Sequence, residues 1–135
     1  MKPVYMTIMH DPPEHIGDCL RCSIASILEL PASEVPHFSG LDPWTDEPCD
    51  KWRGHLLNFL APLGLSYIEI PFGTDVLPLW GPFLDFHHTI SGISPRGTRH
   101  SCVGRRGEVV HDPHPSGGGV MPENGEFDVG FICKL

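Results

Sequence analysis

Glutamine is absent from this chain, and basic residues are few, with nine Lys and Arg against seventeen Asp and Glu. The formal net charge of −8 at pH 7 argues against non-specific binding to nucleic acid, because phosphates require a basic surface. No apolar run approaches the roughly 18 residues of a transmembrane helix, and the first residues lack the apolar stretch of a secretory signal. We therefore expect a cytoplasmic protein that binds neither nucleic acid nor a membrane.

The length of 135 residues suits one domain with a hydrophobic core. Apolar residues make up 40% of the chain and charged residues 19%, which excludes a disordered acidic chain. Fifteen Gly and fifteen Pro are spread along the sequence, a distribution that predicts turns between short elements rather than a linker. We expect a single domain over residues 1–135, and the sequence leaves its oligomeric state open.

Hydrophobic periodicity predicts two helices. One face of the first carries the apolar residues Leu20, Ile24, Ile27 and Leu28. This helix spans 18–30, with Asp18 as a suitable N-cap and Pro31 at its end. A second helix spans about 50–63, and Gly64 ends it.

The remaining periodic segments predict strands. Their ranges are 4–9, 66–70, 86–93 and 127–134, together with a hairpin formed by 99–104 and 108–112. In the strand 86–93, His87 and His88 face opposite sides of the sheet. Because helix comes first and mostly antiparallel strands follow, the predicted class is α+β, with an N-terminal helix packed on an antiparallel sheet.

Five cysteines, an odd number at irregular spacing, argue against a disulfide framework. Cys19 lies in the first turn of the predicted helix, where unpaired N–H groups and the positive end of the macrodipole favour a thiolate. The alternative for Cys19 is a small buried apolar side chain. The other four, Cys22, Cys49, Cys102 and Cys133, are expected to pack in or beside the core.

A thiolate nucleophile needs a base within hydrogen-bond reach and a third group that orients the base. In the predicted hairpin His100 falls opposite about Asp112, and strands about 4.8 Å apart bring such side chains into contact. His111 and His114 are competing candidates for the base, although His111 faces away from Asp112 in an extended strand. Alternatively, Asp112 and Pro113 only open a turn.

Three motifs, in this order along the chain, resemble the papain-like cysteine peptidase superfamily: Gly17-Asp18-Cys19, Arg99-His100 and His111-Asp112-Pro113. The likeness is to its small C39-like branch and to uncharacterised bacterial and phage relatives. This resemblance implies a papain-like fold and a thiol hydrolase that cleaves a peptide, isopeptide or related amide bond in a peptide or protein substrate. In such an enzyme Cys19 is the nucleophile, His100 the base and Asp112 the group that orients the base.

The absence of glutamine departs from that family, in which a Gln a few residues before the cysteine usually binds the oxyanion. The backbone N–H of Cys19 and the side chain of His15 are the candidate replacements. Loss of one oxyanion donor costs roughly 100- to 1000-fold in rate. The alternative function is therefore a non-catalytic peptide-binding module that retains the fold.

Further residues near the motifs allow more than one interpretation. Arg96 and Arg99 are candidates to bind an acidic substrate segment or a terminal carboxylate, or they only charge an exposed strand. The Cys19-x-x-Cys22 pair has the spacing of half a zinc site or of a redox dithiol, but neither a second pair nor a preceding βαβ pattern is present. We expect no metal and no cofactor. The glycine run 117–119 is a lid or a plain loop.

Overall fold

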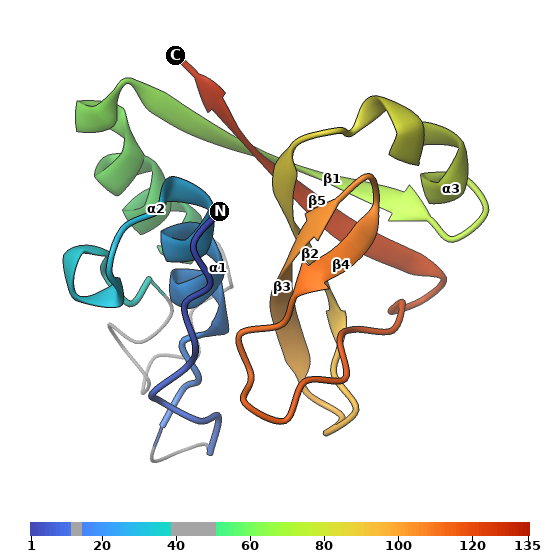
Figure 1. Cartoon of the computed structure of the whole chain (residues 1–135), viewed down its shortest axis with the longest axis horizontal. Helices are drawn as coiled ribbons and strands as arrows, with labels where there is room; N and C mark the ends of the chain where they lie inside the picture. The colour runs from blue at the N-terminus through green and yellow to red at the C-terminus, as the bar shows by residue number, and fades with distance from the viewer. Residues whose placement is uncertain (12–14, 39–50) are drawn as a thin grey trace.

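The computed structural model describes residues 1–11, 15–38 and 51–135 of the chain. It combines helices with one five-stranded antiparallel sheet, so the predicted α+β class is confirmed. In Figure 1, α1 and α2 lie together on one side of the molecule and α3 lies at the far side. Cys49 and the first residue of the predicted second helix fall outside the described ranges.

The helices and strands follow the predicted order from the first helix onward. Their bounds are α1 Cys19–Leu28, η1 Ala32–Glu34, α2 Lys51–Leu60, η2 Ala61–Leu63, β1 Leu65–Gly73, α3 Leu77–Trp80, η3 Gly81–Phe83, β2 His87–Ile93, β3 Arg99–Arg105, β4 Glu108–His111 and β5 Glu126–Lys134. The short helices η1, α3 and η3 were not predicted, because single turns leave little periodicity in a sequence. Helix α1 ends where Glu29 adopts a left-handed conformation, two residues before Pro31.

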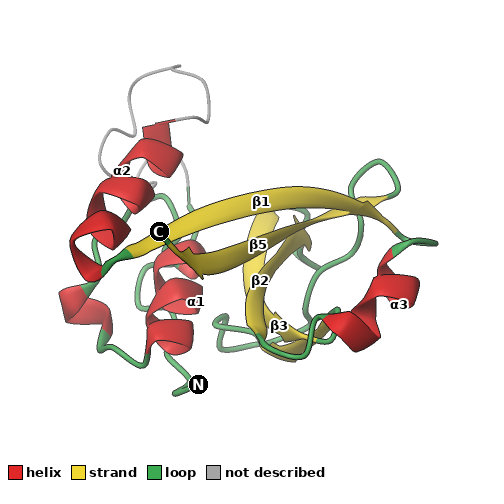
Figure 2. Cartoon of the chain, turned by 90° about the horizontal axis from the view of Figure 1, so that it is seen from above, coloured by secondary structure: helices red, strands yellow, loops and turns green. Residues whose placement is uncertain are grey.

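The sheet has the order β1-β5-β2-β3-β4, and every neighbouring pair is antiparallel. The last strand of the chain therefore lies between β1 and β2 and joins the two halves of the sheet. Figure 2 shows the long strands β1 and β5 side by side, with α1 and α2 near one end and α3 near the other. Consecutive strands β2, β3 and β4 form a meander beside them.

Apolar side chains form two core clusters. The first lies among α1, α2 and β1 and consists of Leu20, Ile24, Ala25, Val35, Phe38, Leu56, Leu60 and Tyr67. The second lies between the sheet and α3 and consists of Leu77, Leu84, Ile90, Cys102 and Val129. Each fully buried aliphatic side chain contributes roughly 1.5–3 kcal/mol of transfer free energy, so the predicted apolar face of α1 fixes that helix against the sheet. Among the described residues no helix has the length and apolar character to cross a membrane.

The predicted strand over 4–9 is wrong. Residues 2–8 form instead a segment without helix or strand, here called the N-terminal strap, that hydrogen-bonds to a helix and a loop. The Lys2 N–H donates to the Ser26 carbonyl (3.1 Å), and the Met6 N–H donates to the Pro113 carbonyl (2.9 Å). The N–H groups of Lys2 and Met6 thus find acceptors without a neighbouring strand.

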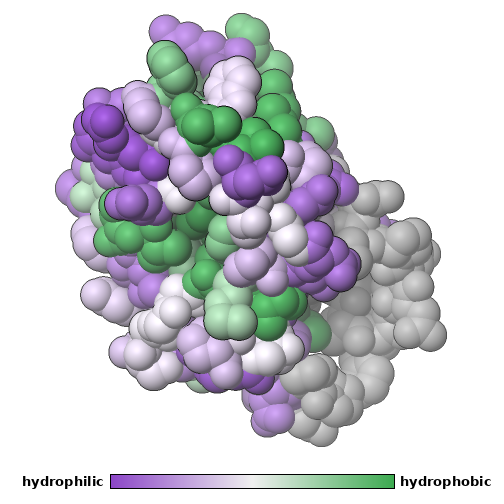
Figure 3. Space-filling model, turned by 90° about the vertical axis from the view of Figure 1, so that its right-hand side faces the viewer, coloured by the Kyte–Doolittle hydropathy of each residue, from purple (hydrophilic) through white to green (hydrophobic). Residues whose placement is uncertain are grey.

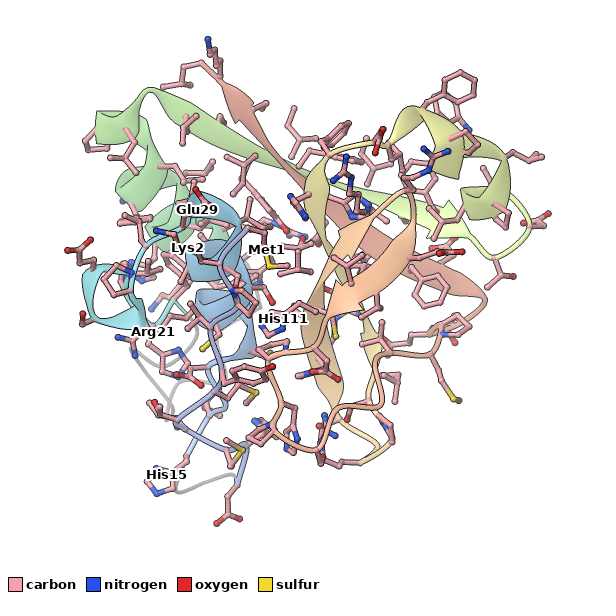
Figure 4. All side chains as sticks on the ribbon, in the orientation of Figure 1. Met1, Lys2, His15, Arg21, Glu29 and His111 are labelled. Atoms are coloured by element: carbon pink, nitrogen blue, oxygen red, sulfur yellow. The ribbon has the colours of Figure 1, made fainter. Side chains whose placement is uncertain are left out.

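His111 from β4 holds the same strap. Its Nε2 donates to the Val4 carbonyl (2.8 Å), and its ring meets Tyr5 edge to face at 5.0 Å between centroids. Figure 4 shows His111 pointing from the hairpin toward the strap. At the other end, the Ile8 N–H donates to Oδ1 of Asp18 (3.3 Å). The strap thus connects α1 with the end of the β3–β4 hairpin.

The face that carries α3 is apolar in places. Its exposed apolar side chains are Val76, Leu79, Trp80, Phe83 and Phe86. Figure 3 views this side of the molecule, where apolar patches lie among polar ones. A groove beside α3 reaches the tip of the hairpin at Arg106 and Gly107.

Candidate active site

His100 and Asp112 form a buried hydrogen-bonded pair. Nε2 of His100 donates to Oδ1 of Asp112 at 2.6 Å, and the two side chains are 4% and 9% exposed. The predicted contact between these side chains is confirmed. Because Nε2 carries the donated proton, the neutral ring presents an unprotonated Nδ1 that can accept a proton.

The hairpin brings the pair together by a different register from the one predicted. A register shift lies between Val103, which pairs with His111, and Gly104, which pairs with Val109. Strand β4 ends at His111, so Asp112 follows the strand rather than belonging to it. The bulge adds a residue to one strand of the pair. Pairing residues by counting symmetrically from the turn therefore predicts the wrong register.

Asp112 accepts two further hydrogen bonds from the loop that follows it. The His114 N–H donates to Oδ1 (2.9 Å) and the Gly119 N–H donates to Oδ2 (2.8 Å). Burial acts to raise the pKa of Asp112, but the hydrogen bonds from His100, His114 and Gly119 outweigh it and hold the pKa below the usual 3.8. Asp112 is therefore a carboxylate at neutral pH. The glycine run supplies one of these donors, and Gly117, Gly118 and Gly119 all have positive φ.

The environment of His100 keeps the ring neutral. Burial is the largest influence and lowers its pKa below 6.5, and the nearby charge of Arg96 lowers it further, against the opposing effect of Asp112. A neutral imidazole with Nε2 bonded to a carboxylate has the protonation state of a resting general base.

Cys19 is the first residue of α1 and is half-buried. Helix α1 packs on β3. On the next turn of the helix, Ser23 Oγ donates to the carbonyl of Ser101, the residue after His100 (3.2 Å). The backbone of Ser101 also lies close enough to the Cys19 thiol to lower its pKa, so the thiol and the imidazole come from adjoining elements.

The prediction that the helix start favours a Cys19 thiolate is wrong for the resting protein. Burial raises the pKa of Cys19 above 9.0. Backbone hydrogen bonds from Ser101 and Leu20 lower it, while the charges of Asp18 and Asp112 raise it. Desolvation together with two nearby carboxylates outweighs the helix terminus, so Cys19 rests as a neutral thiol.

Asp18 occupies the predicted N-cap position, but its side chain makes no capping hydrogen bond. Its Oδ1 accepts from Ile8, and its buried Oδ2 has no hydrogen-bond partner. The guanidinium of Arg21 lies 3.8 Å from this oxygen. Asp18 therefore acts as a buried charge beside Cys19, a role that its sequence position does not indicate.

Cys102 also adjoins the pair, although its sequence position predicts only a core residue. One potential ligand atom from each of His100, Cys102 and Asp112 lies within 4.8 Å of the other two. Cys102 is fully buried, and burial, followed by the charge of Asp112, raises the pKa of its thiol. Cys102 follows His100 by two residues on a strand, so both side chains lie on the same face of the sheet. This spacing in the sequence indicates that Cys102 lies near His100.

The remaining predicted site residues lie in different surroundings. His15 is exposed, forms a backbone bridge with Asp11, and in Figure 4 points away from the sheet. The structure does not bring it to the His100–Asp112 pair. Arg99 forms ion pairs with Glu123 (2.7 Å) and Asp128, which is the expected pattern for a charged strand rather than for a substrate site.

Arg96 lies closer to the pair. Its Nη1 donates to Ser116 Oγ (3.3 Å) and to the Gly117 carbonyl (3.2 Å), and its side chain is exposed. Its charge acts on both His100 and His114. Of the two predicted substrate-binding arginines, only Arg96 is therefore positioned beside the candidate site.

Of the two other candidates for the base, His111 is hydrogen-bonded to Val4 of the N-terminal strap. His114 accepts hydrogen bonds from the Ser116 N–H (3.1 Å) and its hydroxyl (2.7 Å) on Nδ1. Its ring centroid lies 6.3 Å from that of His100. His100 is thus the histidine that is paired with Asp112 through its side chain, and His114 lies beside it.

Comparison with models of protein families, with curated proteins and with solved structures found no match. The α+β class accordingly comes from the structure itself. The chemistry of the site has to be argued from its geometry.

Proposed function

We propose that this protein is a papain-like thiol hydrolase that cleaves a peptide, isopeptide or related amide bond. In this proposal Cys19 is the nucleophile, His100 the general base and Asp112 the residue that orients His100. The observation that carries it is the buried hydrogen bond of 2.6 Å between His100 Nε2 and Asp112, beside the helix that begins at Cys19.

The protonation states of the resting groups define the first step. Both the Cys19 thiol and the His100 ring are neutral, so Nδ1 of His100 accepts the thiol proton as sulfur attacks the substrate carbonyl. The carboxylate of Asp112 stabilises the imidazolium that forms. His100 then returns the proton to the leaving amine, and water releases the acyl group from the Cys19 thioester.

Oxyanion stabilisation is the weakest part of this site. The unpaired backbone N–H groups at the start of α1 can donate to the oxyanion, with Cys19 the first of them. His15 points away, and the chain has no Gln. Because one missing donor costs roughly 100- to 1000-fold, we expect slow turnover.

The raised pKa of Cys19 favours a second candidate function, a non-catalytic module that binds a peptide. In that case Cys19 is an inert thiol, and the His100–Asp112 pair stabilises the loop that follows β4. The two candidates differ in the reactivity of a single sulfur atom.

The test is labelling with a peptidyl vinyl sulfone, an electrophile that reacts with the nucleophile of cysteine hydrolases, followed by mass spectrometry. We expect one adduct, on Cys19, which His100→Ala slows by at least about 100-fold. Cys133, half-buried on β5, provides the comparison thiol, and Cys133→Ser is the matched control. Labelling of Cys19 no faster than that of Cys133 would support the binding module instead.

A further inference from the structure

Three side chains of different ligand chemistry meet beside the candidate nucleophile. His100 and Cys102 project from one face of β3, and Asp112 comes from the loop after β4. One ligand atom from each lies within 4.8 Å of the other two. His100 and Cys102 are buried, and the side chain of Asp112 is only 9% exposed, so the surrounding structure holds all three groups in place.

The ligand set and the spacing both suit one class of metal ion. Imidazole, thiolate and carboxylate are ligands of zinc, with bonds of about 2.0–2.3 Å. In a tetrahedron such bonds place ligand atoms about 3.3–3.7 Å apart. Atoms at the 4.8 Å limit therefore need to approach by up to roughly 1.5 Å, while Nε2 of His100 and Oδ1 of Asp112, now 2.6 Å apart, need to separate slightly. Ca²⁺ and Mg²⁺, by contrast, prefer oxygen ligands.

We propose that His100, Cys102 and Asp112 form a binding site for Zn²⁺, and that Zn²⁺ bound there reversibly blocks His100 as a base. The binding is independent of the proposed function, whereas the inhibition rests on it. Three protein ligands leave a fourth position for water. The metal takes the place of the proton that now joins His100 to Asp112.

Charge and protons balance in this exchange. Zn²⁺ binds Nε2 of His100, and the ring remains neutral by carrying its proton on Nδ1, where it no longer accepts one. The Cys102 thiol releases one proton to solvent when the sulfur binds. The thiolate of Cys102 and the carboxylate of Asp112 then neutralise the two charges of the metal.

Co²⁺ is the probe, because a cobalt–thiolate bond produces a charge-transfer absorption band and a tetrahedral site produces intense visible bands. We expect one equivalent of Co²⁺ to give both bands in the wild-type protein and Zn²⁺ to abolish them. Cys102→Ala should abolish the charge-transfer band, whereas Cys19→Ala and Cys133→Ala should keep it. Absence of the band in the wild type, or its persistence in Cys102→Ala, would overturn the site.

Cys102 is a core residue, so a second variant tests the site in case Cys102→Ala fails to fold. Asp112→Asn removes one anionic ligand and should weaken Co²⁺ binding by at least about tenfold. Unchanged affinity in Asp112→Asn would remove Asp112 from the site and overturn the proposal.

The inhibitory half is measured separately through vinyl sulfone labelling of Cys19. We expect one equivalent of Zn²⁺ to slow labelling by at least about tenfold and a chelator to restore it. Co²⁺ bands without slower labelling would leave the metal site standing and refute the inhibition. If Cys19 of the metal-free wild-type protein is labelled no faster than Cys133, the proposed function is refuted. The cobalt spectrum would still decide whether the metal site exists.

Discussion

Asp112 gathers three hydrogen-bond donors on one carboxylate, namely the His100 ring and the backbone N–H groups of His114 and Gly119. An amide in its place presents one NH₂ group to partners that all donate. One buried donor then loses its acceptor, which costs roughly 1–3 kcal/mol. These three hydrogen bonds argue against the alternative that Asp112 and Pro113 only open a turn.

Asp112→Asn is accordingly expected to lower both reactivity and stability. Vinyl sulfone labelling of Cys19 should slow by about 10- to 100-fold, because His100 loses the carboxylate that fixes its tautomer. Asp112→Ala should slow it further. A lower melting temperature with an unchanged labelling rate would make Asp112 a structural residue and leave His100 without an orienting group.

Asp18 offers a second test at the residue scale. Its buried charge raises the pKa of Cys19, after burial itself, and Asp18→Asn removes that charge while keeping an oxygen that can accept from Ile8. We expect the iodoacetamide reaction of Cys19 to become faster at about pH 7, with the rate profile displaced to lower pH. Asp11→Asn, at an exposed position, is the control. An identical profile for Asp18→Asn and the wild type would contradict the electrostatic role of Asp18.

At the scale of elements, the N-terminal strap joins α1 to the hairpin that carries the His100–Asp112 pair. Ser26 is the point of contact on α1, since its hydroxyl accepts from the Val4 N–H (2.9 Å) and donates to the Cys22 carbonyl (2.7 Å). His111 and Pro113 are the points of contact on the hairpin side. The strap thus links the helix of Cys19 to the hairpin of β3 and β4.

Ser26→Ala should therefore loosen the strap with little change in side-chain volume. The Val4 N–H loses its acceptor, and we expect the free energy of unfolding in urea to fall by about 1–3 kcal/mol. Hydrogen exchange at Val4 should accelerate more than exchange at β5, which lies elsewhere in the fold. Ser116→Ala removes an exposed hydroxyl and serves as the control. Full protection of Val4 in Ser26→Ala would contradict this role.

At the scale of the whole molecule, stability should depend on pH through its buried histidines. Burial lowers the pKa of His88 and of His100 below 6.5. Between these lowered values and 6.5 the unfolded chain binds protons that the folded chain does not, so the free energy of unfolding falls as pH decreases. Asp112, whose pKa is also lowered, adds a further loss below about pH 3.8.

A substitution of His88 tests one contribution to this pH dependence of stability. Its Nδ1 donates to the Thr89 carbonyl (3.1 Å) and its Nε2 accepts from the Gly107 N–H (3.3 Å), so the neutral ring satisfies both neighbours. His88→Phe should be less stable at about pH 7 by roughly 1–3 kcal/mol but should lose less stability between about pH 7 and pH 5. Urea unfolding at the two pH values measures both effects. The same pH-dependent loss in variant and wild type would contradict a contribution from His88.

Local patterns determined much of this fold. The periodicity of residues 20–28 reflects one buried helix face, and strands were predicted over most of β1, β2, β3 and β5, because the order of apolar residues along a single element records how that element is buried. The His100–Asp112 contact was predicted from the sequence as well, since Asp112 directly follows the hairpin that contains His100, although the register differs from the predicted one.

Tertiary structure alone decided the rest. The N-terminal strap and the insertion of β5 between β1 and β2 both depend on partners that the periodicity of a single segment does not identify. The protonation of Cys19 is the clearest case. A helix start taken by itself favours a thiolate, but burial and the charges of Asp18 and Asp112 raise its pKa. Desolvation and Coulomb interactions depend on distance in space, and only the folded chain sets those distances.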